Sequence, residues 1–373
     1  MNQLLALRIL SDIMTWSDSE ATREFGWLSL MSRLKYDGYQ DYLAGARFIE
    51  SLADWVQQFP AEDRTAAYAF VRHCLVYIGP SEMLRLVELL YSSEVQRTLV
   101  KAVAAETGTP PYYIWASKDA RTRYEGLLRR TLFIGLSDGA RLDLFRHANS
   151  GVISNEQIVV AAHVDDDKWE DLLRELREAP GQEADARFAI VYLVDDFAGT
   201  GTTFIRKDRV TGKWKGKLAK FRNTVGDKRL THFAEDLVVC VHHYVANYDA
   251  VNNLNERQTA ALAELGAESW FSDVRFTFGT ILPRELAITR SPQGQAQAFV
   301  PLARKYYDMS IESRHTWEGG TDMRFGFAWC ALPLILEHNT PNNSVSLLWA
   351  ETAGTALDSH AMRPLFRRRH RHV

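Results

Sequence analysis

The sequence predicts an α/β protein whose mostly parallel sheet is flanked by helices and preceded by an all-helical domain. After residue 115, several short runs are apolar and rich in β-branched or aromatic residues, as in strands buried on both faces. These runs alternate with helical patterns, which is typical of a mostly parallel sheet. Before residue 115, apolar residues recur at helical spacing instead, for example Phe48, Leu52, Trp55 and Phe59.

Three segments are expected. Gly108-Thr-Pro-Pro111 interrupts the helical pattern and separates a helical N-terminal domain, residues 1–115, from an α/β domain, residues 116–350. Residues 351–373 are expected to form a basic C-terminal tail, disordered over Arg363–His372.

The helical domain shows no readable chemistry. The spacing of Phe70, Cys74 and Ile78 predicts a helix that reaches Ile78, and Ser81 is the expected N-cap of the next helix, Met83–Tyr91. We interpret its aromatic residues as core.

Composition restricts the class of protein. The 373 residues are 46% hydrophobic and 24% charged, which is ordinary for a globular protein, and a net charge of −3 argues against a general nucleic-acid binder. Cys74, Cys240 and Cys330 lie in apolar runs without metal-ligand spacing, so we expect reduced core residues in a cytoplasmic protein. No stretch is long and apolar enough to span a membrane.

The stretch FAIVYLVDDFAGTGTT carries most of the chemical information. A buried strand is predicted at Phe188–Val194, followed by two acids, Asp195 and Asp196. The loop after them can direct consecutive N–H groups and Thr hydroxyls at an anion. An anion cradle beside two carboxylates suits a ligand with a phosphate at one end and vicinal hydroxyls or a cation at the other, such as a ribose 5-phosphate. The loop residues are Phe197, Ala198, Gly199, Thr200, Gly201, Thr202 and Thr203.

This stretch resembles the phosphoribosyl pyrophosphate (PRPP) motif of type I phosphoribosyltransferases, in which Asp-Asp and three residues precede Thr-Gly-x-Thr. The resemblance implies that Asp195 and Asp196 hold the ribose hydroxyls and Mg²⁺, and that Phe197–Thr203 holds the 5-phosphate. No GxxxxGK[ST] motif occurs, and no GxGxxG motif follows this strand. An ordinary strand–turn–helix with acidic capping residues remains open.

A second loop follows another predicted buried strand, Thr131–Leu136. Ligands of doubly wound sheets lie beyond the carboxyl ends of the strands, so this loop would meet the first if the two strands are neighbours. The resemblance implies that it grips the pyrophosphate, with Arg141 as the catalytic charge and Asp138 near the metal. A tight turn that caps a helix is the other interpretation. The loop residues are Ser137, Asp138, Gly139, Ala140 and Arg141.

Arg206–Arg222 is rich in Lys and Arg and has a single acid. Thr211–Gly216 within it predicts a turn or hairpin, inserted where the resembled family has a helix. A lid over the ligand's phosphates and a solvated basic face both remain open.

Further strands are predicted at Asp236–His243, Trp270–Leu282 and Met323–Glu337, and Asn155–Val164 is a strand or a short helix. His242 and His243 are adjacent in a strand and should face opposite sides of the sheet, which argues against a metal pair.

Two polar clusters have simpler structural explanations. Asp165–Asp167, after His163, are expected to cap a helix that runs to Glu178. The turn His338–Asn343 either presents amides to a ligand or bonds its own backbone.

The chain as a whole also resembles the phosphoribosyltransferase-like proteins of bacterial conflict systems, including retron-type antiviral cassettes. The features that carry this resemblance are the helical N-terminal half, the loops Ser137–Arg141 and Phe197–Thr203 with their acids, and the turn His338–Asn343. That resemblance implies an effector directed at nucleotides or nucleic acid under the control of protein or nucleic-acid components, and it leaves a homo-oligomer open. Three functions remain: phosphoribosyl transfer or cleavage, non-catalytic sensing of PRPP or a nucleotide, and nucleic-acid binding through Arg206–Arg222 and the basic C-terminal tail.

Overall fold

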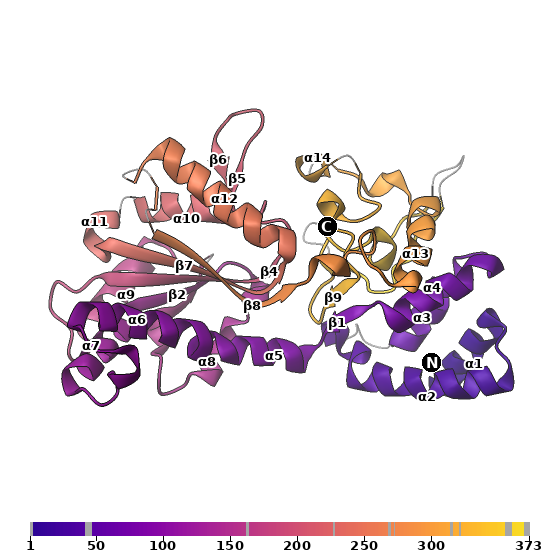
Figure 1. Ribbon diagram of the computed structural model, residues 1–373, viewed down its shortest axis with the longest axis horizontal. Helices are drawn as coiled ribbons and strands as arrows, with labels where there is room; N and C mark the ends of the chain where they lie inside the picture. Colours follow the sequence, from indigo (N-terminus) through magenta and orange to yellow (C-terminus); the bar gives the residue numbers. More distant parts are fainter. Residues whose placement is uncertain are drawn as a thin grey trace. The chain divides into compact units, whose positions relative to one another are not determined.

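The structure is a computed structural model, and it describes residues 3–41, 47–161, 164–226, 228–267, 270–271, 273–313, 316–320, 322–354 and 360–368 (Figure 1). His163 lies outside these ranges. The chain divides into two compact units, of which unit 1 is Met1–Met83 with Pro283–Val373 and unit 2 is Leu84–Leu282.

Unit 2 is built on a five-stranded sheet in which every strand pair is parallel, as predicted. The strand order β3-β2-β4-β7-β8 reverses direction between β2 and β4. In open α/β sheets, ligands bind beyond the carboxyl ends of the strands at such a reversal. The strands are β2 (Thr131–Gly135), β3 (Ile158–Val160), β4 (Phe188–Ala198), β7 (Phe233–Asn247) and β8 (Asp273–Leu282).

Apolar side chains on both faces explain why these runs form central strands. On one face, Val191 and Leu193 of β4 belong to a core shared with Trp169, Phe221 and Leu254 of the covering helices α9, α10 and α12. On the other face, aromatic rings pack in a row from Tyr192 through Phe133 to Phe145 of α8. The helices of this unit are α6 (Gln96–Thr107), α7 (Lys118–Arg129), α8 (Leu142–Ala148), α9 (Asp166–Arg177), α10 (Lys217–Gly226), α11 (Arg229–His232) and α12 (Tyr248–Leu265) (Figure 1).

Strand β4 is longer than predicted. Its pairing with β7 continues past Val194, with Asp195 opposite His243 and Phe197 opposite Val245, and the strand ends at Ala198. Backbone pairing therefore extends through the two acids, because β7 is long enough to offer partners to the whole segment. The loop begins at Gly199 rather than at Phe197.

Unit 1 combines the N-terminal helices with the C-terminal part of the chain. Phe48 and Phe366 stack at 5.7 Å between ring centroids, and Trp55 Nε1 donates to the Leu347 carbonyl at 2.7 Å. This division differs from the expected boundaries at residues 115 and 350. The helices are α1 (Gln3–Met14), α2 (Asp18–Leu34), α3 (Phe48–Gln57), α4 (Ala61–His73), α13 (Gly294–Lys305) and α14 (Thr316–Gly319), and α5 (Pro80–Leu89) runs through the division.

Two predictions for unit 1 were wrong. The helix expected to reach Ile78 ends at His73, and Val76–Ile78 forms strand β1, which pairs in parallel with β9 (Leu334–Leu336). The long strand expected over Met323–Glu337 is reduced to β9, because Ala328, Trp329 and Ala331 adopt left-handed backbone angles.

Other predictions concerned the N-caps of two helices and the order of the C-terminal tail. Helix α5 begins at Pro80, so Ser81 is not its N-cap, whereas Asp165 caps α9 as expected by accepting from the Lys168 N–H at 2.8 Å. The expected disordered tail is also contradicted over its first residues, because Leu365 and Phe366 are buried in the core.

Cys74, Cys240 and Cys330 are buried free thiols, as expected. Among the described residues, no helix has both the length and the apolar character needed to cross a lipid bilayer.

Candidate functional site at the carboxyl edge of the sheet

The two predicted loops meet at the strand reversal. β2 and β4 are neighbours, and the Ser137 hydroxyl donates to Asp195 Oδ1 at 2.5 Å. Asp195 is 4% exposed. The loop after β2 is thus tied directly to the first acid of the PRPP-like motif.

Asp195 has a second partner that the sequence did not predict. The Lys217 ammonium forms an ion pair with Asp195 Oδ2. Lys217 is the first residue of α10, and its backbone N–H donates to the Thr203 carbonyl at 3.1 Å. Lys217 lies within the predicted basic segment, but the sequence did not show how far the segment's turn extends, and so did not place this lysine at the acid.

Asp196 lies on the opposite face of the sheet, because side chains alternate along β4. It is half-buried. On this face the Tyr244 hydroxyl donates to the Ala140 carbonyl at 2.9 Å and so anchors the second loop. Burial, together with the negative charges of Asp143 and Asp196, raises the pKa of Tyr244 and keeps its hydroxyl protonated.

The loop after β4 is tied to α12 through the Thr200 carbonyl. Arg257 Nη1 donates to the Thr200 carbonyl at 2.9 Å and to the Ile205 carbonyl at 3.3 Å, and Asn253 Nδ2 also donates to Thr200 at 3.3 Å. Within the described ranges, the N–H groups of Thr200 and Gly201 donate to no backbone or side-chain acceptor, and the same holds for Thr203. These three amides are therefore available to bind an anion.

Two glycines make this close packing feasible. Gly201 has φ +71°, and a Cβ there would lie 2.8 Å from the Leu254 side chain. Gly216 has φ +116°, and a Cβ there would lie 2.3 Å from the Phe204 carbonyl oxygen. The loop is therefore enclosed by α12 and by the chain that enters α10.

The second loop is a short turn, Ser137–Ala140, that leads into α8. Arg141 caps α8 with φ +49°, a left-handed angle that is unfavourable for a residue with a Cβ. Asp138 is exposed and Gly139 is buried. Capping and ligand contact are compatible at Arg141, so the structure leaves both interpretations in place.

The basic segment forms a hairpin, as predicted, with strands β5 (Arg206–Lys207) and β6 (Trp214–Lys215) (Figure 1). Lys207 Nζ pairs with Glu264 and Lys215 Nζ with Asp208, both at 2.7 Å. Part of its positive charge is thus compensated. Closure over a ligand stays a prediction.

Comparison with protein families identifies the family to which the chain belongs. The family model PRTase-CE, a phosphoribosyltransferase-like family, matches residues 52–368. The chain belongs to the PRTase-CE family. Neither the search of curated proteins nor the search of solved structures found a match. Because the match runs through both units, the PRTase-CE family includes much of unit 1 as well as the sheet.

The two central histidines of this PRTase-CE chain are neutral. Burial lowers the pKa of His242 to about 3 and that of His243 to about 4. His242 Nδ1 contacts the Thr277 hydroxyl at 2.9 Å, whereas the His243 ring packs against Phe204 on the other face. The predicted separation of the pair is confirmed, and the described residues contain no cluster of three or more His, Cys, Asp or Glu suited to a metal.

The turn His338–Asn343 belongs to unit 1 of this PRTase-CE chain. The Asn343 amide donates to the Phe327 carbonyl at 3.2 Å, so it bonds the backbone of another segment and not that of its own turn. Presentation of amides to a ligand stays a prediction.

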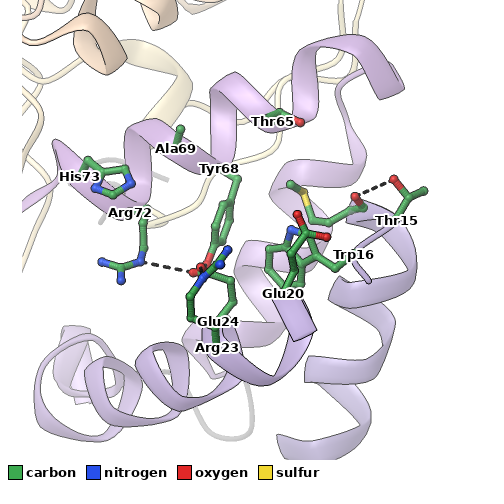
Figure 2. A pocket seen from close by; sticks show the side chains of 11 residues that line it. Thr15, Trp16, Glu20, Arg23, Glu24, Thr65, Tyr68, Ala69, Arg72 and His73 are labelled. Atoms are coloured by element: carbon green, nitrogen blue, oxygen red, sulfur yellow. Dashed lines mark hydrogen bonds and ion pairs between the residues drawn. The ribbon is translucent and has the colours of Figure 1, made fainter. Parts of the chain in front are cut away.

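A second polar feature of the PRTase-CE chain was not predicted. A pocket of about 370 Å³ in unit 1 surrounds Glu24, which is 7% exposed (Figure 2). Glu24 accepts from the Tyr68 hydroxyl at 2.7 Å, Arg23 Nε at 3.0 Å and Arg72 Nε at 3.3 Å. Three of the polar lining residues thus bond the same carboxylate. The lining residues are Met14, Thr15, Trp16, Glu20, Arg23, Glu24, Thr65, Tyr68, Ala69, Arg72 and His73.

Proposed function

We propose that this protein binds a ribose phosphate, with PRPP as the best-fitting ligand, at the carboxyl edge of the unit 2 sheet. The main support is the loop Gly199–Thr203, in which the Thr200 carbonyl is held by α12 while three amides have no protein acceptor in the described ranges. It follows two carboxylates at the strand reversal, where ligands of such sheets bind.

Each part of the ligand then has a partner of suitable chemistry. The loop amides and Thr hydroxyls would bind the 5-phosphate as hydrogen-bond donors. Asp195 and Asp196 would accept from the ribose hydroxyls, and the loop Ser137–Arg141 would meet the diphosphate on carbon 1.

Mg²⁺ fits this site as an ion that arrives with the ligand. It is usually bound by one or two carboxylates together with substrate phosphates and waters, so it does not need a cluster of acids. Asp138, which is exposed, and Asp196 are the carboxylates we assign to it, whereas Asp195 faces the other side of β4 from Asp196. When bound, the ion would neutralise negative charge on a departing diphosphate.

We propose phosphoribosyl transfer, or cleavage of such a bond, as the reaction. The bond between ribose carbon 1 and the diphosphate oxygen breaks, and its electron pair leaves with the diphosphate. The ring then carries positive charge until an acceptor bonds to carbon 1. This needs positioning and charge stabilisation rather than a nucleophilic side chain. The resemblance to conflict-system proteins supports a role as a nucleotide-directed effector in antiviral defence.

Non-catalytic sensing is the second candidate. Its support is that both carboxylate oxygens of Asp195 already have protein partners, Ser137 and Lys217, an arrangement that a binding-only protein tolerates.

Calorimetry with PRPP and Mg²⁺ tests the binding proposal. Asp196→Asn should weaken PRPP binding by about a hundredfold, because it removes charged hydrogen bonds to the ribose. Asp165→Asn serves as the control, since Asn caps a helix as well as Asp does and should leave binding unchanged. Failure of the unaltered protein to bind PRPP, or equal affinities for all three proteins, would remove this assignment.

A Mg²⁺-dependent turnover assay separates the two candidates. A screen of bases, nucleotides and partner components should reveal consumption of PRPP or a nucleotide. Arg141→Ala should then lower the rate constant more than it weakens binding, because its charge acts mainly as the bond breaks. Tight binding without turnover under every condition would favour sensing.

A further inference from the structure

At the proposed ligand site, Lys217 forms an ion pair with the Asp195 carboxylate. A ribose phosphate brings negative charge to an edge that already carries Asp138, Asp195 and Asp196. The Lys217 ammonium lies at this edge and neutralises the Asp195 carboxylate.

The ribose also needs the carboxylate that Lys217 contacts. Oδ1 of Asp195 accepts from Ser137 and Oδ2 pairs with Lys217, and the Asp195 side chain is only 6% exposed. Each oxygen keeps a further lone pair, but this burial leaves a ribose hydroxyl little access to Asp195 unless one of these partners moves aside.

The Lys217 side chain can leave Asp195 without a movement of the backbone. Its N–H is held by the Thr203 carbonyl, and the preceding Gly216 packs against Phe204, so the main chain is fixed beside the phosphate loop. The side chain is 21% exposed and has four rotatable bonds, which let the ammonium change partners at little cost.

We propose that Lys217 is a ligand-binding residue that exchanges partners. In the ligand-free protein its ammonium pairs with Asp195. In the complex the ribose hydroxyls donate to Asp195 and the ammonium binds a phosphate oxygen of the ligand. In both states the ammonium faces a negative charge and Asp195 accepts hydrogen bonds, which avoids the cost of a buried charged group without a partner. The inference rests on the proposed function and adds a residue that the PRPP-like motif does not contain.

Ligand affinities of Lys217→Met and Lys217→Arg test the exchange, with ribose 5-phosphate and PRPP as probes. Lys220→Met on the exposed side of α10 is the matched control. Lys217→Met should weaken PRPP binding by at least tenfold, whereas Lys217→Arg and Lys220→Met should stay within threefold of the unaltered protein. An equal loss for ribose 5-phosphate would assign Lys217 to the 5-phosphate, and a loss confined to PRPP would assign it to the diphosphate.

Other outcomes overturn the inference. Unchanged or tighter binding of both ligands by Lys217→Met would mean that Lys217 only obstructs Asp195. Equal losses in Lys217→Met and Lys217→Arg, with a lower melting temperature, would mean a structural ion pair. If Lys217→Met does not fold, the double variant Asp195→Asn, Lys217→Met should still bind at least tenfold more weakly than Asp195→Asn alone, and equal affinity there would contradict us. If the unaltered protein binds neither ligand, the proposed function fails and this inference with it.

Discussion

Two buried carboxylates, Glu24 in unit 1 and Asp195 in unit 2, are satisfied in different ways. Glu24 accepts from two guanidinium groups and a tyrosine hydroxyl, all on helices α2 and α4 (Figure 2). Asp195 has one ammonium and one hydroxyl, and it lies near the carboxyl end of β4, which leads into a loop whose amides lack protein acceptors in the described ranges. Burial alone therefore does not identify a ligand site. The neighbouring donors that the fold leaves available distinguish Asp195 from Glu24.

The largest expected effect is on stability in unit 1. Glu24→Ala should lower the free energy of unfolding by about 3 kcal/mol, because it removes the shared partner of Arg72 and Tyr68 in a buried cluster. Urea denaturation measures this, and Glu62→Ala, an exposed acid on α4, should cost less than about 0.5 kcal/mol. PRPP affinity should not change in either variant. A weakened affinity in Glu24→Ala would show that Glu24 is functional after all.

Lowering the pH should destabilise the two units at different pH values, because unit 2 contains the buried His242–His243 pair and unit 1 the Glu24 cluster. Burial holds the pKa of His242 and His243 well below the value near 6.5 that they have in the unfolded chain. Between pH 6.5 and 4 the unfolded state binds more protons, so the sheet of unit 2 loses stability as the pH falls through this window, by a few kcal/mol at pH 5.

The Glu24 cluster responds at lower pH. Burial raises the pKa of Glu24, but hydrogen bonds from Tyr68, Arg23 and Arg72 outweigh it and leave the pKa below 4.5. Its contribution is thus present above pH 4.5 and lost as the pH falls further. Hydrogen exchange as a function of pH should show unit 2 loosening first. The double variant His242→Gln, His243→Gln isolates this pair from His232 and His360, whose pKa values are also lowered by burial. If this variant lost as much stability between pH 6.5 and 4 as the unaltered protein does, the acid response could not be assigned to His242 and His243.

The smallest expected effect concerns the loop that accompanies Asp195. Gly201→Ala and Gly212→Ala both place a Cβ at a positive φ, +71° and +66°, and each should cost about 1 kcal/mol. Only at Gly201 does the Cβ also meet Leu254, whereas Gly212 has no neighbour within 4 Å. Gly201→Ala should therefore also weaken PRPP binding by at least tenfold, and Gly212→Ala should not. Equal affinities in the two variants would mean that the shape of the loop is unimportant for the ligand.

The sheet could be predicted from sequence because its strands are almost continuously apolar. Four of the five strands were predicted in type and approximate position, and β3 was left open between strand and helix. The prediction of a long strand near residue 330 was wrong. The segment FGFAWCALPLIL is as apolar as a strand, but it turns at residues with left-handed backbone angles, such as Ala328, and a hydrophobic pattern does not reveal these angles.

The site could be predicted only in part. The acids and the loop after β4 form a local pattern, and their proximity to Ser137 followed from strand order. Lys217, Arg257 and Asn253 come from later helices, and their contacts depend on how α10 and α12 pack on the loop. Similarly, Glu24 meets Arg72 only through the packing of α2 against α4, which one sequence does not specify.

The parallel pairing of β1 with β9 has a consequence for synthesis on the ribosome. Val76–Ile78 emerges early but must wait for Leu334–Leu336, whereas all five strands of unit 2 lie between them in the chain. Domains generally fold as units during translation, N-terminal segments first. Here the inserted unit can complete its sheet while the unit that begins the chain is still missing a strand. The edge that carries Asp195 is therefore expected to form in the nascent protein before the N-terminal helices acquire their final core.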